Sequence, residues 1–331
     1  MVPIEDVSIF PSPFHEGEQT LQRQIGADQR MAEIGRKVVR PYMPDQHRDF
    51  YCQLPFILVG TVDPMGEAWA SLATGKPGFV TSPSPRRLEF MADRDPDDPA
   101  DAGMDDGAAI GLLGIEFHTR RRNRVNGRLG RTGRHGFSVD VEHSFGNCPK
   151  YIRLRNFSGF EPNGVPRPGA TRTSRLSPRA RKMIASADTF FVASYVDLGD
   201  GRRQVDVSHR GGKPGFVRVD DGDRLTIPDF VGNRHFNTLG NLLLNGRAGL
   251  LFMDFDTGDL LQMTGDASLI MDGPDVACFQ GSERAWTFRP RAIVYRSAAV
   301  GMRWTAIQDG ESPFSIMTGA WGRGTVAHRT D

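Results

Sequence analysis

The chain has 331 residues, enough for two domains with separate hydrophobic cores, and its 41 lysine and arginine residues nearly balance 40 aspartate and glutamate residues. A chain so close to neutral has no overall field that would recruit nucleic acid or an anionic membrane, so any affinity for anions must be local. Its 3 cysteines are far apart and fit neither a disulfide framework nor a zinc spacing. Because no signal sequence or long apolar run is found, we expect a cytoplasmic protein without a membrane span.

Residues 1–42 are expected to form a helical extension ahead of the first domain. His15, Glu16 and Glu18 lie close together in this segment, but no other metal-binding residues follow at a suitable spacing. The same residues suit the start of a helix, where a polar side chain caps free backbone amides. We therefore predict a surface helix here and no bound metal.

The strongest pattern in the sequence is an internal repeat. The hexapeptide Gly-Lys-Pro-Gly-Phe-Val occurs at residues 75–80 and again at residues 212–217. Similar blocks flank both copies in the same order: residues 44–55 and 178–189, residues 56–64 and 190–198, and residues 111–119 and 249–257. The offset grows only from 134 (residue 56 to 190) to 138 (residue 111 to 249), so the chain is predicted to contain two diverged copies of one domain.

Each copy is predicted to contain a short helix that begins at proline, a β-hairpin and further antiparallel strands. In the second copy, glycine-containing turns at residues 198–201 and 256–258 separate apolar strands, and Asn126-Gly127 in the first copy is interpreted as a hairpin turn. This spacing favours a mainly β fold, a β-barrel with α-helices. The expected domains are a degenerate copy at residues 43–160, a linker at residues 161–175, a second copy at residues 176–310 and a C-terminal tail at residues 311–331.

In the first copy, three arginines are predicted to share one face of a strand. Side chains alternate along a strand, so Arg120, Arg122 and Arg124 point the same way and need an anion or acidic partner opposite them. Either they reach across to the second copy and its ligand, or they pair with the acidic loop at residues 93–106. Asn147 and Cys148 are assigned to the same site, although a free cysteine is more often a small buried residue than a reactive one.

The second copy has a polar strand end before its hexapeptide. The residues concerned are Ser208, His209, Arg210, Gly211 and Gly212. The two glycines allow the backbone to approach a flat ligand and leave amide groups free to meet it. A simple turn is the alternative, but Arg210 and Gly211 have no counterpart in the first copy, so we favour a ligand site.

A predicted helix start follows in the second copy only. The candidate residues are Arg234, Asn237, Thr238 and Asn241. Free amides and the helix dipole favour an anion at such a position, and an arginine adds a charge-assisted contact. The equivalent stretch of the first copy is acidic and proline-rich, so only the second copy is predicted to bind a phosphate.

These features resemble the FMN-binding split-barrel family typified by pyridoxamine 5'-phosphate oxidase. The second copy has the polar strand end, the helix start, an Asn-Gly-Arg break at residues 245–247 and the following Gly-Leu-Leu-Phe, and residues 119–127 and 145–152 resemble a long, duplicated bacterial branch. The resemblance implies two tandem FMN-binding split barrels that pair as a pseudo-dimer, with the cofactor at their interface. The family's phosphate residues align with Arg234, Asn237 and Thr238 only after a shift, and its pyridoxamine-phosphate ligands have no match, so vitamin B6 oxidation is not expected.

The resemblance implies a flavin-dependent oxidoreductase that acts on a small molecule, with FMN as cofactor and FAD as the alternative. NAD(P)H or a partner reductase would supply the electrons, and no catalytic side chain is assigned because the chemistry belongs to the cofactor. The alternative function is a non-catalytic split-barrel module that binds or senses flavin or haem. A homodimer is a further expectation.

Overall fold

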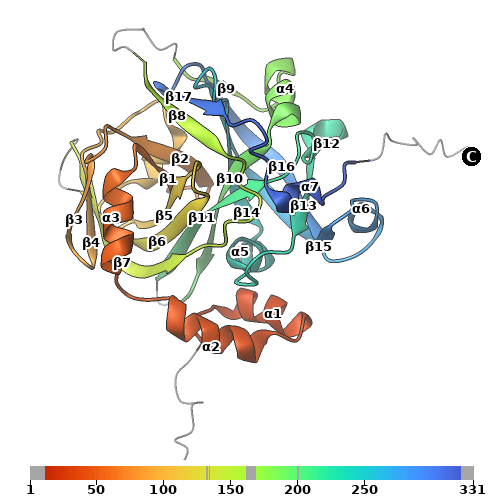
Figure 1. The fold of residues 1–331 in the computed structure, drawn as a ribbon, viewed down its shortest axis with the longest axis horizontal. Helices are drawn as coiled ribbons and strands as arrows, with labels where there is room; N and C mark the ends of the chain where they lie inside the picture. The colour runs from red at the N-terminus through yellow and green to blue at the C-terminus, as the bar shows by residue number, and fades with distance from the viewer. Residues whose placement is uncertain (1–11, 132, 134, 162–168, 200, 322–331) are drawn as a thin grey trace, which may run out of the picture.

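The computed structural model describes residues 12–131, 133, 135–161, 169–199 and 201–321. Antiparallel β-strands dominate and form two large sheets (Figure 1), which confirms the predicted mainly β fold with α-helices. Neither sheet closes into a barrel through a pairing between its described edge strands. No helix within the described ranges is long and apolar enough to cross a membrane, and the cytoplasmic location stays a prediction.

The first half of the chain forms a seven-stranded sheet in the order β2-β1-β5-β6-β7-β4-β3. Its strands are β1 (Phe56–Val62), β2 (Ala68–Thr74), β3 (Val80–Ser84), β4 (Arg87–Phe90), β5 (Ala109–Glu116), β6 (Arg121–Gly130) and β7 (Phe137–Gly146). The helix α3 (Asp45–Gln53) precedes them, as predicted, and the short helix η2 (Pro99–Gly103) lies in the acidic loop between β4 and β5.

The second half forms a sheet in the order β11-β10-β14-β15-β16-β13-β12. Its strands are β10 (Thr189–Asp197), β11 (Arg203–Gly211), β12 (Arg218–Val219), β13 (Leu225–Phe230), β14 (Arg247–Met253), β15 (Leu260–Ile270) and β16 (Ser282–Arg296). The helices of this half are α4 (Pro178–Ser186), η3 (Asp221–Asp223), α5 (Asn237–Asn245), α6 (Pro274–Ala277) and α7 (Pro313–Ile316).

The two sheets have the same strand order, with β10 to β16 in the places of β1 to β7. The pairing of β1 with β5 and of β10 with β14 nevertheless shows that the predicted offset between β1 and β10 is wrong by one residue. Val59 lies opposite Leu112, and Val192 lies opposite Leu250, which is the equivalent of Leu112 at an offset of 138. Val59 therefore matches Val192, at an offset of 133 rather than 134, because an error of one residue would exchange the two faces of the strand.

The repeated hexapeptide forms the same turn in both halves. The amide of Phe79 donates to the carbonyl of Lys76 at 2.9 Å, and the amide of Phe216 donates to the carbonyl of Lys213 at 2.9 Å. Gly78 and its counterpart Gly215 have φ angles of 94° and 85°, which a side chain would strain. The repeat in the sequence is thus a repeat of local backbone structure.

The predicted hairpin turn at Asn126-Gly127 is wrong. These residues lie inside β6 and form a β-bulge, and Thr264-Gly265 forms the equivalent bulge in β15. A Cβ atom on Gly127 would lie 2.0 Å from the carbonyl oxygen of Asp140, so glycine serves a close backbone approach at this position rather than a turn.

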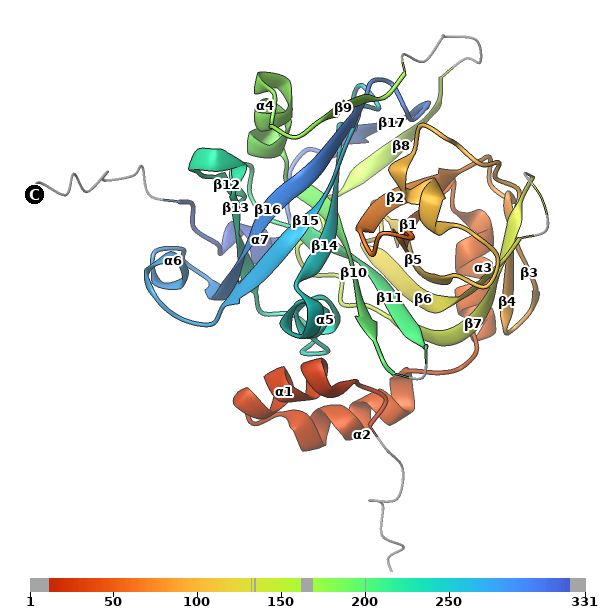
Figure 2. The same cartoon turned by 180° about the vertical axis from the view of Figure 1, so that it is seen from behind.

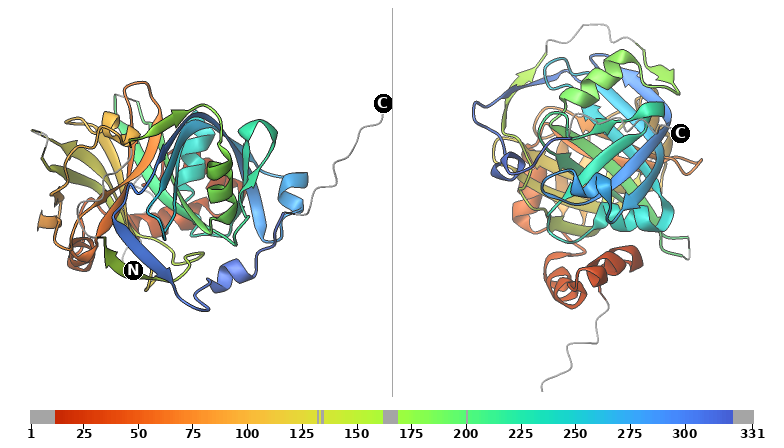
Figure 3. Two further views of the ribbon diagram at one scale, coloured as in Figure 1. Left: turned by 90° about the horizontal axis from the view of Figure 1, so that it is seen from above. Right: turned by 90° about the vertical axis from the view of Figure 1, so that its right-hand side faces the viewer.

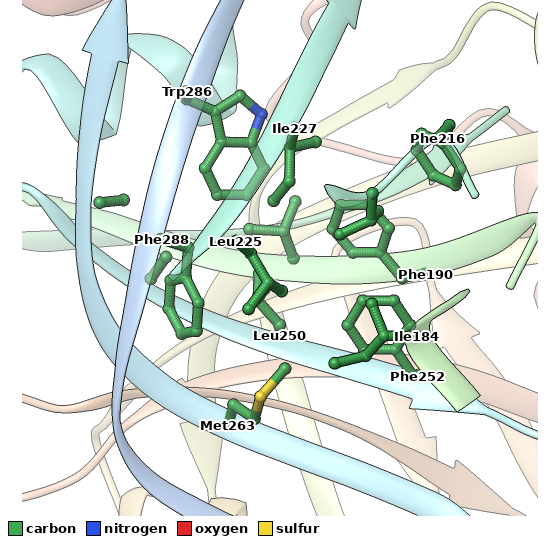
Figure 4. Packing of buried hydrophobic residues seen from close by; sticks show 14 of the residues in the cluster. Ile184, Phe190, Phe216, Leu225, Ile227, Leu250, Phe252, Met263, Trp286 and Phe288 are labelled. Atoms are coloured by element: carbon green, nitrogen blue, oxygen red, sulfur yellow. The ribbon is translucent and has the colours of Figure 1, made fainter. Parts of the chain in front are cut away.

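Each sheet covers its own apolar cluster, and a third cluster lies between the halves. Phe190, Trp286 and Phe288 are buried in the second half (Figure 4). The third cluster contains Leu58 from the first sheet and Phe191 from the second, which point away from their own cores. Both faces of the central strands are therefore buried.

The halves pack side by side in a reciprocal way (Figure 3). Strand β5 lies against β11, and its counterpart β14 lies against β2. A Cβ atom on Gly111 would lie 2.6 Å from the carbonyl oxygen of Val205, and one on Gly249 would lie 2.4 Å from the carbonyl oxygen of Ala68. Each half thus contributes one glycine and one backbone carbonyl to an equivalent pair of contacts, which is the pattern of an isologous interface.

The N-terminal segment forms α1 (Glu16–Gln24) and α2 (Asp28–Val38), and α1 packs on α5 (Figure 2). His15 caps α1 and Glu18 completes the capping box, so the predicted helix start is confirmed. The predicted surface position is wrong, since Glu18 is 1% exposed beneath α5. No metal-binding cluster is found among the described residues.

The connecting segments are also part of the packed structure. The predicted linker contains β9 (Thr171–Thr173), which pairs with β16, while residues 162–168 of that linker lie outside the described residues. Strand β8 (Arg155–Phe160) of the first half pairs with β17 (Met302–Ala306) of the second. In the predicted C-terminal tail, the indole of Trp321 donates to the carbonyl of Phe216 at 2.8 Å.

The reciprocal glycine contacts give a first prediction. Gly249→Ala would force a methyl group against the backbone of Ala68, so we expect the free energy of unfolding to fall by about 1–3 kcal/mol. Urea unfolding measures this change. Gly169→Ala is the control, because no heavy atom of the described residues lies within 4 Å of its added Cβ atom, and equal losses in both variants would contradict the close packing.

Candidate functional site

A cavity that opens to solvent lies where the two halves meet, and its space together with the solvent at its mouth is about 930 Å³. The second half contributes Ser208, His209, Arg210 and Gly211 from β11, and Arg234, Asn237 and Thr238 around the start of α5. The first half contributes Arg122 and Arg124 from β6, and Asn147 and Cys148 after β7. The structure thus brings together most of the residues that the sequence selected.

Three selected residues do not line the cavity. Arg120 precedes β6 with a φ of 59°, so it leaves the face shared by Arg122 and Arg124, and its Nε donates to the carbonyl of Ile152 at 2.9 Å. Gly212 belongs to the hexapeptide turn and packs against Phe216. Asn241 is fully buried within α5. The sequence grouped these residues with the others because spacing along the chain does not reveal a turn or the inner face of a helix.

Below the cavity, the carboxylate of Asp206 on β11 joins both halves. Arg124 donates to it at 2.9 Å and Asn126 at 2.8 Å, both from β6 of the first half, while Asn241 donates at 2.9 Å from α5. Asp206 is 0% exposed. Of the three arginines predicted to share a strand face, Arg124 is therefore the one that pairs with a carboxylate of the second half.

The acidic loop has other partners. Arg94 pairs with Asp101 at 2.9 Å, and Arg296 from β16 pairs with Asp98 at 3.0 Å. The acidic loop therefore pairs with Arg94 and Arg296 and not with Arg122 or Arg124.

Several polar side chains at the helix start are already engaged by the protein. Thr238 Oγ1 donates to Ser208 Oγ at 3.0 Å, and Ser208 also accepts from Arg124. The side-chain amide of Asn237 donates to Glu18 of α1. Burial, together with the charge of Asp206, raises the pKa of Glu18 well above its usual value. The sequence placed Glu18 at a helix start but not at this site, because Glu18 lies far from α5 along the chain.

The backbone at this helix start remains available. Phe236, the N-cap residue of α5, provides no side-chain acceptor and has a φ of 60°. The first intrahelical hydrogen bond runs from the amide of Gly240 to the carbonyl of Phe236 at 2.6 Å. The amides of residues 237–239 lie before this bond and have no acceptor within the helix. Arg234 beside them is exposed and has no ion-pair partner in the described part of the chain. This end of the cavity is suited to an anion.

The wall between the halves is cationic. Arg210 donates to Asp229 at 2.7 Å, and Arg122 Nε donates to the carbonyl of Cys148 at 2.6 Å. Burial, with Arg124 and Arg210 nearby, lowers the pKa of Arg122 to about 10. Arg122 keeps some exposed surface because it lines the cavity, so an anionic or electron-rich ligand there would offset its buried charge.

Four buried nitrogen atoms of residues that line the cavity have no hydrogen-bond partner among the described residues. They are Arg124 Nε, Asn147 Nδ2, His209 Nε2 and Arg210 Nε. Burial and the neighbouring Arg122 lower the pKa of His209 well below its usual value, so the imidazole is neutral. An unsatisfied buried polar group costs about 1–3 kcal/mol, so such a cluster at a cavity indicates a ligand or ordered water.

Aromatic side chains complete the cavity, and residue spacing did not identify them. The rings of Tyr151 and Phe230 lie 5.1 Å apart at 30° to each other, and both line the cavity. The hydroxyl of Tyr151 donates to the carbonyl of Val231 at 3.2 Å, and burial raises its pKa to about 12. Tyr151 does lie within the segment at residues 145–152 on which the family resemblance partly rested, which was the available signal.

Comparison with known proteins gives structural neighbours, whereas no family model and no curated protein matches the chain. One neighbour is a putative pyridoxamine 5'-phosphate oxidase from Lactobacillus delbrueckii, at 14% identity and a TM-score of 0.26, with 32% of this chain and 95% of that chain covered. Another is an FAD-binding protein from Mesorhizobium loti, at 11% identity and a TM-score of 0.27, with coverages of 39% and 99%. A third is HutZ, the heme storage protein from Vibrio cholerae, at 17% identity and a TM-score of 0.25, with coverages of 37% and 95%.

One of these three neighbours is described as a putative pyridoxamine 5'-phosphate oxidase, the enzyme that typifies the FMN-binding split-barrel family. This is the family that the sequence resembles. Each of these three matches covers less than half of the chain. The paired arrangement of the halves and the cavity between them are therefore described from this chain alone.

The buried pair across the interface gives a second prediction. Arg124→Leu would leave the Asp206 carboxylate without its charged partner, so we expect the free energy of unfolding to fall by about 3–5 kcal/mol. Arg128→Leu on the same strand is the control, because Arg128 is 32% exposed and its ion pair with Glu142 should contribute less than about 1 kcal/mol.

Denaturant unfolding of the double variant Arg124→Leu with Asp206→Asn completes this test. Part of the lost stability should return, because the buried charge is removed together with its partner. Equal losses in Arg124→Leu and Arg128→Leu would show that the interface does not depend on the pair.

Proposed function

We propose that the cavity binds a phosphorylated flavin, FMN with FAD as the alternative, and that the protein is a flavin-dependent oxidoreductase acting on a small molecule. The observation that carries the proposal is one cavity with a free helix start and Arg234 at one end and unpartnered buried nitrogen atoms along its wall. These donors match an anionic group linked to a flat, polar ring system.

The phosphate would lie at the start of α5. The amides of residues 237–239 precede helix pairing, and Arg234 supplies a positive charge. The side chains of Asn237 and Thr238 hold the helix in place through Glu18 and Ser208 rather than donating to the ligand themselves. Backbone amides and one arginine would therefore replace the family's trio of phosphate-binding side chains.

The ring would lie along the wall formed by both halves. Arg122, Arg210 and Asn147 offer N–H groups to its pyrimidine edge, and the positive charge there favours electron uptake. His209 is neutral and adds a nitrogen without adding charge. When bound, a flavin supplies hydride or electron exchange, and NAD(P)H or a partner reductase is the expected donor.

We also infer that the halves descend from one barrel by duplication and act as an internal pair. The common strand order, the equivalent bulges and the reciprocal glycine contacts support this view. Both walls of the cavity come from one chain, so a second copy is not required to complete it. The homodimer stays a prediction.

The flavin site gives a third prediction. Arg234→Ala should raise the Kd for FMN by roughly 10- to 100-fold, because a charge-assisted contact to the phosphate is lost. Titration of the ligand-free protein with FMN, followed by flavin fluorescence quenching, measures the change. Riboflavin, which lacks the phosphate, should bind equally weakly to the wild type and to the variant.

Arg87→Ala is the matched control, since Arg87 lies on β4 of the first half and pairs at the surface with Asp140 at 2.9 Å. Its Kd for FMN should stay within about twofold of the wild-type value. A colourless protein that gains no flavin on titration would overturn the proposal. Equal losses in Arg87→Ala and Arg234→Ala would overturn the assignment of the phosphate to α5.

A non-catalytic haem-binding or sensing module is the second candidate, and His209 favours it. A neutral imidazole with an unpartnered nitrogen in a cavity suits coordination to haem iron.

A fourth prediction separates the two functions. If the protein is a flavin oxidoreductase, anaerobic mixing of its flavin-bound form with NADPH or a reductase should bleach the flavin, whereas a haem module should show a haemin spectrum that His209→Ala abolishes.

A further inference from the structure

A second cavity, of about 1300 Å³, occupies the equivalent position in the other half. It is lined by residues 71–74 of β2, which match the cavity-lining end of β11, and by residues 297, 299 and 300 after β16, which match the segment after β7. The second half contributes Leu260 and Arg296, just as the first half contributes Arg122 and Asn147 to the flavin cavity. The two cavities are therefore counterparts.

The second cavity has a different charge. Leu260 and Ala73 stand where the flavin cavity has Arg122 and Arg210. In place of the start of α5, the acidic loop contributes Asp93, Asp95, Asp97, Asp98 and Asp101. A phosphorylated flavin does not suit this site, because carboxylates replace the helix amides and apolar residues replace Arg122 and Arg210.

One buried cation in this acidic cavity lacks a partner. Arg131 is 9% exposed and lines the cavity, and its Nε and Nη1 have no hydrogen-bond partner among the described residues. Its guanidinium lies 5.3 Å from the ring centroid of Phe137. Burial and nearby Arg94 lower the pKa of Arg131 more than Asp101, Asp105 and Asp93 raise it, so a bound anion would further stabilise its charge. The planar fork of an arginine matches a carboxylate best.

The aspartates of the loop are mostly engaged. Asp98 pairs with Arg296, Asp101 pairs with Arg94, and Asp93 contacts His135 at 2.9 Å. The carboxylate of Asp97 has no partner in the part of the chain that the structure describes, and it is exposed at the cavity. A carboxylate without a described partner and an arginine with unpaired N–H groups line one cavity, which is therefore suited to a ligand that carries both charges.

The remaining wall is apolar and includes Val59, Leu72, Met104, Phe137, Leu260 and Val300. We propose that this cavity binds a small zwitterion, an amino acid with an apolar side chain, with its carboxylate on Arg131 and its ammonium group near Asp97. A simple carboxylate is disfavoured by the acidic loop, and a simple amine leaves Arg131 unpartnered. This site is separate from the flavin cavity and does not depend on it.

Isothermal titration of the full-length protein tests the proposal with L-alanine, L-valine, L-leucine and L-phenylalanine. At least one of the larger three should bind, and more tightly than L-alanine. The matched probes for leucine are 4-methylpentanoate, which lacks the ammonium group, and 3-methylbutylamine, which lacks the carboxylate. Each should bind at least about tenfold more weakly than leucine, because one charged contact is lost.

Two variants assign the contacts. Arg131→Met should abolish amino-acid binding, and Asp97→Asn should weaken it by about tenfold. Arg131→Met should also raise the melting temperature of the ligand-free protein, because it removes buried N–H groups without partners. The far-ultraviolet circular dichroism spectrum serves as the folding control for both variants, so the test does not require FMN to bind. Failure of all four amino acids to bind, or unchanged binding in Arg131→Met, would overturn the proposal.

Discussion

The structure depends on one buried carboxylate at the junction of its halves. Asp206 on β11 is fully buried and accepts from Arg124 and Asn126 of the first half and from Asn241 of α5. A buried carboxylate tolerates no loss of partners, so the two sheets and α5 must meet in one arrangement. That arrangement places Arg124 against Ser208, which also accepts from Thr238, and so fixes the floor of the cavity between the halves.

The segment between the fourth and fifth strands of each sheet decides how the halves differ. In the second half it contains α5, and in the first half it contains the acidic loop with η2. The strand order around these segments is the same. One cavity therefore presents helix amides and arginines, while its counterpart presents aspartates around Arg131. Two cavities of different charge arise from the same strand order because the segment that differs connects two strands, and a connecting segment can change without disturbing the sheet.

The sequence predicted those features that depend on neighbouring residues. The hexapeptide turn, α3, α4 and the start of α5 follow from proline and glycine positions and helical spacing. The alignment of β1 with β10 missed by one residue for a physical reason. All seven residues of β1 are buried, as are the first eight of β10, so neither strand has a polar face that would fix its register.

The sequence by itself determined the repeat, the mainly β fold and the segments that line the cavity between the halves, because turns, helix starts and strands depend on local residue patterns. Only the tertiary structure decided which side chains in those segments are free to meet a ligand. Asn237 is held by Glu18 and Ser208 by Arg124, and these partners come from other elements. Arg120 leaves the strand face through a left-handed backbone that no alternation pattern reveals. Contacts between residues far apart along the chain depend on how the two halves pack, which local patterns do not encode.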